Sequence, residues 1–300
     1  MKVLGRYKNG NYDVTLLSDG TKIRETEDDE FIPDFAESMD IKLTNHCSLG
    51  CPYCHEGSTP EGEHGDILNE KFIYTLHPYQ EVALGGGDVT SHPNLIPFLR
   101  RLKERHIIAN ITVNQYQLYN GKELIQQLVD EQLIYGLGVS LMVLTDEFIE
   151  TVSQFPNAVI HVINGVVLPE EIEEMADHNL KLLILGYKEL RRGNSFLQEH
   201  LEQVEKNKAW MKEHLWEYIS KFAVVSFDNL AIEQLDIKSR LSDEEWNEFF
   251  MGDDSEFTYY IDMVNRQFAK SSTAPFDERY PLMDSCDDMF EKIRKRKHES

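Results

Sequence analysis

Three of the four cysteines in this 300-residue chain fall within the stretch Cys47-Ser-Leu-Gly-Cys51-Pro-Tyr-Cys54, directly after the strand-like run 39–45. Thiols bunched in this way, in a chain otherwise almost free of cysteine, favour metal ligation over disulfides. A cubane iron–sulfur cluster normally takes four cysteines, so three of them leave one iron without a protein ligand. An open coordination position is what a reactive metal site requires. The motif therefore predicts a reactive iron–sulfur centre.

Two other interpretations of the cysteines remain open. The first is a structural zinc site with His46 or His55 as the fourth ligand, although zinc sites often use two separated Cys-x-x-Cys pairs and no second pair exists here. The second is a redox-active pair formed by Cys51 and Cys54.

Charge and hydropathy restrict the partners. The formal net charge of −23 argues against a nucleic-acid backbone as a partner, because phosphate binding needs a positive face. No apolar run reaches the length of a membrane span, and the first residues lack a signal-peptide core, so we expect a cytoplasmic protein with no membrane partner.

The chain reads as alternating strands and helices. The turn signals Asn9-Gly10 and Asp19-Gly20 predict a small β-meander over 5–26. Apolar runs then predict parallel strands, buried on both faces, that alternate with amphipathic helices. The expected strands are 39–45, 81–88, 107–113, 135–141, 158–163 and 180–186. The expected helices are 66–77, 93–104, 121–133, 145–154, 169–178 and 196–221. A C-terminal hairpin is expected from 256–262 and 267–270.

Ligands of parallel sheets bind beyond the carboxyl ends of the strands. Several polar or glycine-rich segments of this chain directly follow expected strands and should therefore lie at that position. They are the three cysteines, Gly85 to Asp88, Asn114, Ser140, Asn164 and Lys188. Ser140 is equally consistent with a small packed residue, Lys188 with an anion contact or a strand cap, and loop 55–65 with a site cover or a plain surface excursion. His161 lies within an apolar strand and is expected to be a core histidine with a hydrogen-bonded partner.

The spacing Cys-x3-Cys-x2-Cys, with Tyr53 before the third cysteine, resembles the signature of the radical S-adenosylmethionine (radical SAM) enzymes. One strand and one helix later, Gly86-Gly87-Asp88 resembles that family's Gly-Gly-Glu element, with aspartate for glutamate and Val89 where proline is common. The shorter acid leaves direct contact by Asp88 in question.

The resemblance implies a [4Fe–4S] cluster on Cys47, Cys51 and Cys54 that reduces S-adenosyl-L-methionine to a 5′-deoxyadenosyl radical. It further implies an oxidoreductase that abstracts hydrogen from a metabolite, nucleotide or peptide, with an external low-potential electron donor such as flavodoxin or ferredoxin. The residues that it assigns to the cofactor are Tyr53, Gly85, Gly86, Gly87, Asp88, Asn114, Ser140 and Asn164. The alternatives are a zinc-stabilised interaction module and an iron–sulfur electron carrier without S-adenosylmethionine chemistry.

The fold implied by the resemblance is α/β, a partial (β/α)6 radical SAM barrel with a small N-terminal β-meander and a C-terminal α+β extension. We expect the meander at 1–34, the core barrel at 35–195 and the extension at 196–300. Only Cys286 remains outside the motif, so an all-cysteine auxiliary cluster is excluded and Cys286 is expected to be an inert buried thiol. The small meander argues against a self-contained peptide-modifying enzyme.

Overall fold

The computed structural model describes residues 2–299, with side chains through Arg294. Its first part is a three-stranded antiparallel sheet in the order β1-β2-β3, as the turn signals predict. Gly10 turns the chain between the first two strands with a φ of +59°, a conformation that glycine adopts without steric cost. The strands are β1 (Val3–Asn9), β2 (Tyr12–Leu17) and β3 (Lys22–Glu25).

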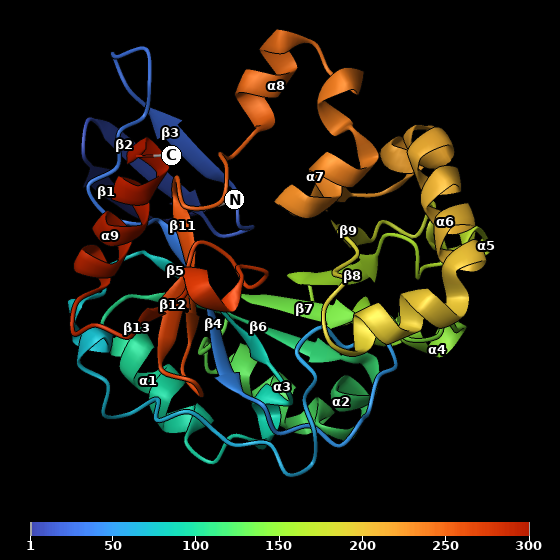
Figure 1. Cartoon of the computed structure of the whole chain (residues 1–300), viewed down its shortest axis with the longest axis horizontal. Coiled ribbons are helices and arrows are strands. Elements are labelled where there is room, and N and C mark those ends of the chain that lie inside the picture. Colours follow the sequence, from blue (N-terminus) through green and yellow to red (C-terminus); the bar gives the residue numbers. More distant parts are fainter. Residues whose placement is uncertain (1, 300) are drawn as a thin grey trace.

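A second, ten-stranded sheet contains a run of seven parallel strands that lie side by side in their sequence order (Figure 1). This sequential order is shared with (β/α) barrels. The large, mostly parallel α/β sheet is thus confirmed, and its form as a partial six-stranded barrel stays a prediction. The seven strands are β4 (Ser38–Thr44), β5 (Glu81–Gly86), β6 (Ile108–Asn114), β7 (Gly136–Ser140), β8 (Ala158–Ile163), β9 (Lys181–Leu185) and β10 (Val224–Phe227).

The C-terminal part of the chain completes both sides of this sheet. Strand β10 pairs with β9, while β11 (Thr258–Asp262) pairs in parallel with β4. The predicted hairpin is confirmed, because β12 (Gln267–Ala269) runs antiparallel to β11, and β13 (Tyr280–Pro281) follows beyond it. Strands from before and after residue 195 therefore share one sheet, and the division into 1–34, 35–195 and 196–300 stays a prediction.

Helices follow most of the strands. They are α1 (Leu95–Glu104), α2 (Gln115–Asn120), α3 (Lys122–Asp130), α4 (Asp146–Val152), α5 (Pro169–Met175), α6 (Arg192–Tyr218), α7 (Asn229–Leu235), α8 (Asp243–Phe249) and α9 (Cys286–Glu299). None of the described helices combines the length and the apolarity needed to cross a membrane.

Two predicted helices differ from the observed ones. The segment expected as a helix over 66–77 contains only a 3₁₀ helix, Lys71–Thr75. Asp66 binds the Asn69 backbone and side chain locally, and Pro78 disfavours helical geometry at the residue before it. The helix expected over 121–133 is observed as the shorter α3, and a further helix that was not expected precedes it: Asn114 and Gln117 form a capping box at the start of α2, and Gly121 separates α2 from α3.

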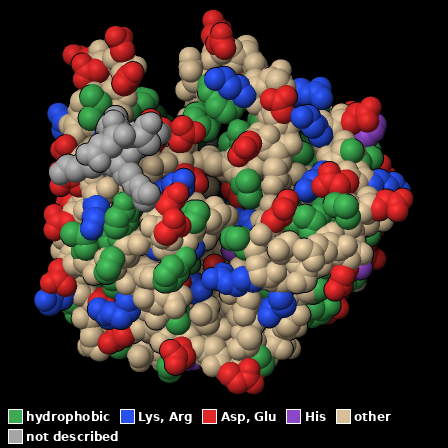
Figure 2. Space-filling model, in the orientation of Figure 1, with side chains coloured by type: hydrophobic (Ala, Val, Ile, Leu, Met, Phe, Trp, Pro, Cys, Tyr) green, Lys and Arg blue, Asp and Glu red, His purple; other side chains and the backbone are tan. Residues whose placement is uncertain are grey.

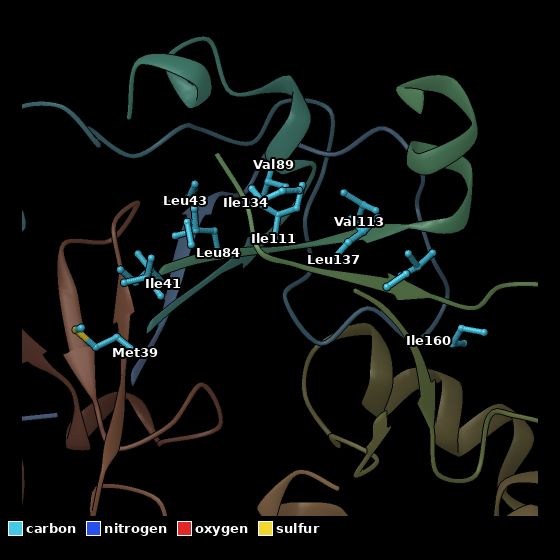
Figure 3. Packing of buried hydrophobic residues seen from close by; sticks show 14 of the residues in the cluster. Met39, Ile41, Leu43, Leu84, Val89, Ile111, Val113, Ile134, Leu137 and Ile160 are labelled. Carbon is cyan, nitrogen blue, oxygen red and sulfur yellow. The ribbon is translucent and has the colours of Figure 1, made fainter. Parts of the chain in front are cut away.

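Alternation along the strands separates two environments. Met39, Ile41 and Leu43 of β4 are buried in the main hydrophobic cluster with apolar residues of neighbouring strands, such as Leu84 (Figure 3). Since successive side chains of a strand point to opposite faces, the residues between them lie on the other face. On β4 these are Ser38, Asp40, Lys42 and Thr44. This second face of the sheet is therefore polar.

Candidate functional site

The cysteine motif forms a loop that begins where β4 ends. Cys47, Cys51 and Cys54 are all free thiols of intermediate exposure. Gly50 has a φ of +63°, and the Cys54 N–H donates to the Cys51 carbonyl at 3.3 Å, so the loop turns tightly between its second and third cysteines.

The three thiols lie close enough together for their charges to interact. Burial raises the pKa of Cys51, and the neighbouring Cys54 and Cys47 raise it further. Burial likewise raises the pKa of Cys47, with a contribution from Cys54 and from Asp88. Because each thiolate disfavours the next, a positively charged metal centre would stabilise all three together.

Two amides from α2 and its cap face the sulfurs. The side chain of Asn114 donates to Cys51 Sγ at 3.6 Å, and that of Gln117 donates to Cys47 Sγ at 3.7 Å. Both donors favour the deprotonated, ligating form of the cysteines. Asn114 was expected at this rim from the sequence, whereas Gln117 was not.

The donor set is three free thiols, the number that a cubane with one open iron would take. Within the described part of the chain, no three His, Cys, Asp or Glu side chains are gathered as one metal ion requires. A zinc ion would hold each sulfur at about 2.3 Å and draw them tightly together. A cubane binds each cysteine through a different iron, so its thiolates stand farther apart. The zinc arrangement with His46 or His55 as the fourth ligand stays an alternative.

The triple glycine lies at the same rim as the cysteine loop. The Gly87 N–H donates to the Thr44 carbonyl and the Asp88 N–H to the His46 carbonyl, both at 2.7 Å. A Cβ at Gly86 would collide with the Thr44 carbonyl, and one at Gly87 with the His46 carbonyl. These two glycines thus let the end of β5 pack against the start of the cysteine loop.

Gly85 and Asp88 have surroundings unlike those of Gly86 and Gly87, which pack against the cysteine loop. A Cβ added at Gly85 would meet nothing within 4 Å, so open space adjoins its backbone. The carboxylate of Asp88 accepts hydrogen bonds from the backbone N–H and the hydroxyl of Thr90. Asp88 thereby caps the short 3₁₀ helix Val89–Ser91. Of the four residues assigned to the cofactor here, Gly85 is therefore the one beside free volume.

Tyr53 and Ser140 lie near a small apolar cavity of about 40 Å³. The Tyr53 hydroxyl donates to Met142 Sδ at 3.2 Å, and Tyr53 lines the cavity with Leu141 and Val162. Ser140, partly exposed, ends β7 just before Leu141. A cavity of this size is too small for an aromatic ring, so the role of Tyr53 and Ser140 toward a cofactor stays a prediction.

Asn164 lies away from open space. Its side chain is fully buried and donates to Gln234 of α7 at 3.0 Å, and Gln234 also accepts from the Tyr187 N–H and donates to the Tyr187 carbonyl. The other side-chain atom of Asn164, Oδ1, is buried without a hydrogen-bond partner. Asn164 thus joins α7 to the sheet, and its role as a ligand stays a prediction.

Two consecutive arginines at the start of α6 hold the cysteine loop. Arg192 donates from Nε to the Cys51 carbonyl at 2.9 Å and from Nη1 to the Ser58 carbonyl at 3.0 Å. Arg191 donates to the His55 carbonyl at 2.7 Å. The sequence analysis missed both residues; an Arg-Arg pair directly after the last expected strand was the available signal.

A buried ion-pair network underlies loop 55–65. Lys42 Nζ lies 2.7 Å from Glu56 Oε2 and 3.5 Å from Asp262 Oδ2, and all three side chains are at least nine-tenths buried. Burial alone would raise the pKa of Glu56, but a hydrogen bond from His55 and the charge of Lys42 hold it well below its usual range. The loop therefore reaches the polar face of the sheet, which favours the site-cover interpretation over a plain surface excursion.

His161 and Lys188 also lie on this side of the sheet. Burial lowers the pKa of His161 to about 4, so the ring is neutral near neutral pH. It packs against Gly138, where a Cβ would collide with the ring, and no described residue hydrogen-bonds to it, contrary to the sequence expectation. Lys188 donates to Ser272 Oγ at 3.1 Å and partly offsets the effect of burial, which raises the pKa of Asp40.

Cys286 has the inert environment that was expected. It is 2% exposed, and burial raises its pKa to about 12. Its thiol donates to the Phe72 carbonyl at 3.4 Å, far along the chain from the other cysteines.

Comparison with solved structures identifies a similar fold. The structure of Streptococcus suis SuiB bound to S-adenosylmethionine has a TM-score of 0.54 at 15% identity, over 86% of this chain and 64% of SuiB. SuiB bound to its precursor peptide SuiA gives 0.49, and SuiB alone gives 0.46. This chain thus matches less than two thirds of the length of SuiB. No protein-family model and no curated protein sequence matches the chain.

Proposed function

We propose that this chain is a radical S-adenosylmethionine enzyme. The observation that carries the proposal is the geometry at the end of β4. Three free thiols that influence one another lie there, and the triple glycine is hydrogen-bonded to the same strand end. The fold similarity to a structure that contains S-adenosylmethionine supports the choice of cofactor.

Cys47, Cys51 and Cys54 would hold the [4Fe–4S] cluster. When bound, the cluster would supply the electron that cleaves S-adenosylmethionine and yields the hydrogen-abstracting 5′-deoxyadenosyl group. The amides of Asn114 and Gln117 would donate to the ligand sulfurs, and hydrogen bonds of this kind tune a cluster's reduction potential.

The chain's own residues would shape the rest of the site. Open space beside Gly85 leaves room for a ligand to approach the backbone. Ser140, Asn164 and Asp88 are retained as proposed contacts of the cofactor, together with Gly86 and Gly87. Arg192 would keep the loop in place through the Cys51 carbonyl.

The test is anaerobic reconstitution with iron and sulfide, followed by reduction in the presence of S-adenosylmethionine. We expect broad visible absorbance and release of 5′-deoxyadenosine, with release lost in Cys51→Ala. A protein that takes up zinc and stays colourless would be an interaction module instead. A coloured protein that never releases 5′-deoxyadenosine would be an electron carrier. Cys286→Ala is the matched control, because that thiol lies outside the site.

A further inference from the structure

A large cleft lies in the C-terminal part of the molecule, away from the cysteine loop. Its volume is about 860 Å³, and it is bounded by α7, α8, the segment before β11, the segment after β12, and α9. Figure 2 shows the surface hollowed beside the lobe of α8. A volume of this size is sufficient for a substantial ligand.

One component of the cleft is apolar and aromatic. Trp246 and Phe250 of the α8 region line it, with ring centroids 4.3 Å apart and an interplanar angle of 19°. Both rings are only partly buried, so apolar surface is open to an occupant of the cleft. Large apolar side chains at a rim mark a surface that a partner covers.

The other component is acidic. Among the residues whose side chains are described, four carboxylates line the cleft, at Glu233, Asp253, Asp254 and Glu278, against one cation, Lys270, which pairs with Glu278 at 3.5 Å. Asp254 accepts a hydrogen bond from Asn229 at 2.8 Å, and Glu233 is exposed with no ion pair among the described residues. The lining therefore complements a cationic occupant. A second copy of this chain, with a net charge of −23, does not meet that requirement.

The cleft is continuous with the polar face of the main sheet. Ser271 and Thr273 line it, and between them Ser272 accepts the hydrogen bond from Lys188, which follows β9. Burial raises the pKa of Asp40 on β4, and the charge of Asp254 adds to that effect. An occupant of the cleft would thus extend toward the face on which Lys42 and Gly85 lie.

We propose that this cleft binds a basic peptide segment with alternating Lys or Arg and apolar side chains. An extended strand sends successive side chains to opposite sides, so such a segment presents cations to the carboxylates and apolar groups to Trp246 and Phe250. The assignment of this peptide as the substrate rests on the proposed function. The binding itself does not.

The experiment uses the full chain as purified and a fluorescein-labelled peptide of alternating Lys and Leu, with binding followed by anisotropy. The basic peptide should bind, and its affinity should fall as the salt concentration is raised. A matched peptide with Glu in place of Lys should not bind. The double variant Glu233→Gln/Asp254→Asn should weaken binding by about tenfold. The control Glu104→Gln, an exposed carboxylate on α1, should leave binding unchanged.

The variant Phe250→Ser tests the apolar component. Because Phe250 is only partly buried at the end of α8, this change should leave the main sheet folded and weaken binding of the peptide severalfold. Equal affinity of wild type and the double variant, or of the basic and acidic peptides, would overturn the proposal. Displacement by spermine at equal concentration would also overturn it and identify a small polyamine as the occupant. None of these readouts depends on release of 5′-deoxyadenosine, so each proposal can fail separately.

Discussion

Lys42 of β4 and Glu56 of the loop after Cys54 form a buried ion pair, with Nζ and Oε2 2.7 Å apart. The pair joins a strand of the main sheet to the segment that directly follows the third cysteine. Asp262 of β11 contacts the same ammonium at 3.5 Å, so three separate parts of the chain meet at one charge. The position of the cysteine loop is thereby linked to the C-terminal hairpin.

We expect Glu56→Gln to destabilise the protein by about 2–3 kcal/mol, because it leaves the buried Lys42 with a single, longer ion pair. Chemical denaturation monitored by circular dichroism measures the loss. Glu61→Gln, an exposed acid in the same loop, is the control and should change stability by less than about 0.5 kcal/mol. Equal effects of the two substitutions would show that the ion pair does not hold the loop.

The glycines provide a matched pair of substitutions. Gly87→Ala should destabilise the fold by about 1–3 kcal/mol, because the new Cβ collides with the His46 carbonyl. Gly85→Ala should leave stability almost unchanged, because its Cβ enters open space, yet it should weaken S-adenosylmethionine binding measured by calorimetry. Normal cofactor affinity in Gly85→Ala would argue against a ligand beside this residue.

His161 predicts an acid sensitivity. Its pKa is about 4 in the folded protein against 6.5 when unfolded, so the unfolded chain takes up a proton that the folded chain does not. Stability should therefore fall as pH decreases from about 6.5 to about 4, by up to about 3 kcal/mol for this group alone. His161→Gln should flatten that part of the stability profile, whereas His178→Gln, at an exposed position, should not. An identical pH profile in His161→Gln would contradict the assignment.

Thiol reactivity should separate the cysteines into two groups. In the native protein without metal, iodoacetamide should modify the partly exposed Cys47, Cys51 and Cys54, as mass spectrometry of peptides would reveal. Cys286 should react only after unfolding, because it is buried and its pKa is raised to about 12. Rapid native labelling of Cys286 would show that α9 opens readily.

Local patterns were sufficient for much of the fold. The apolar runs of β6 and β8 identified those strands to within one residue, because strands covered on both faces carry an almost continuous apolar sequence. The helix expected over 66–77 was wrong, since the local bonds of Asp66 and the effect of Pro78 outweigh its apolar spacing. The pairing of β11 with β4 joins residues more than 200 positions apart, and no local pattern encodes it.

The candidate site divides in the same way. Cys47, Cys51, Cys54 and the triple glycine were recognised because their chemistry is local and unusual. Arg192 and the Lys42–Glu56 pair were missed, because each acts through a partner on a distant segment. A lysine between Ile41 and Leu43 of a predicted strand was the one local sign that a buried carboxylate would be needed.

The neighbours of β4 and β9 have a consequence for biosynthesis. Each of these two strands leaves a row of backbone hydrogen-bonding groups bare until its outer partner arrives, and the partners come from residues 224–227 and 258–262. A ribosome-bound chain that has emerged only as far as α6 therefore exposes two unpaired edge strands, β4 and β9, at the same time. Premature release at that stage should yield aggregated, insoluble protein. The later strands of the chain prevent this aggregation by pairing with both edges of the sheet.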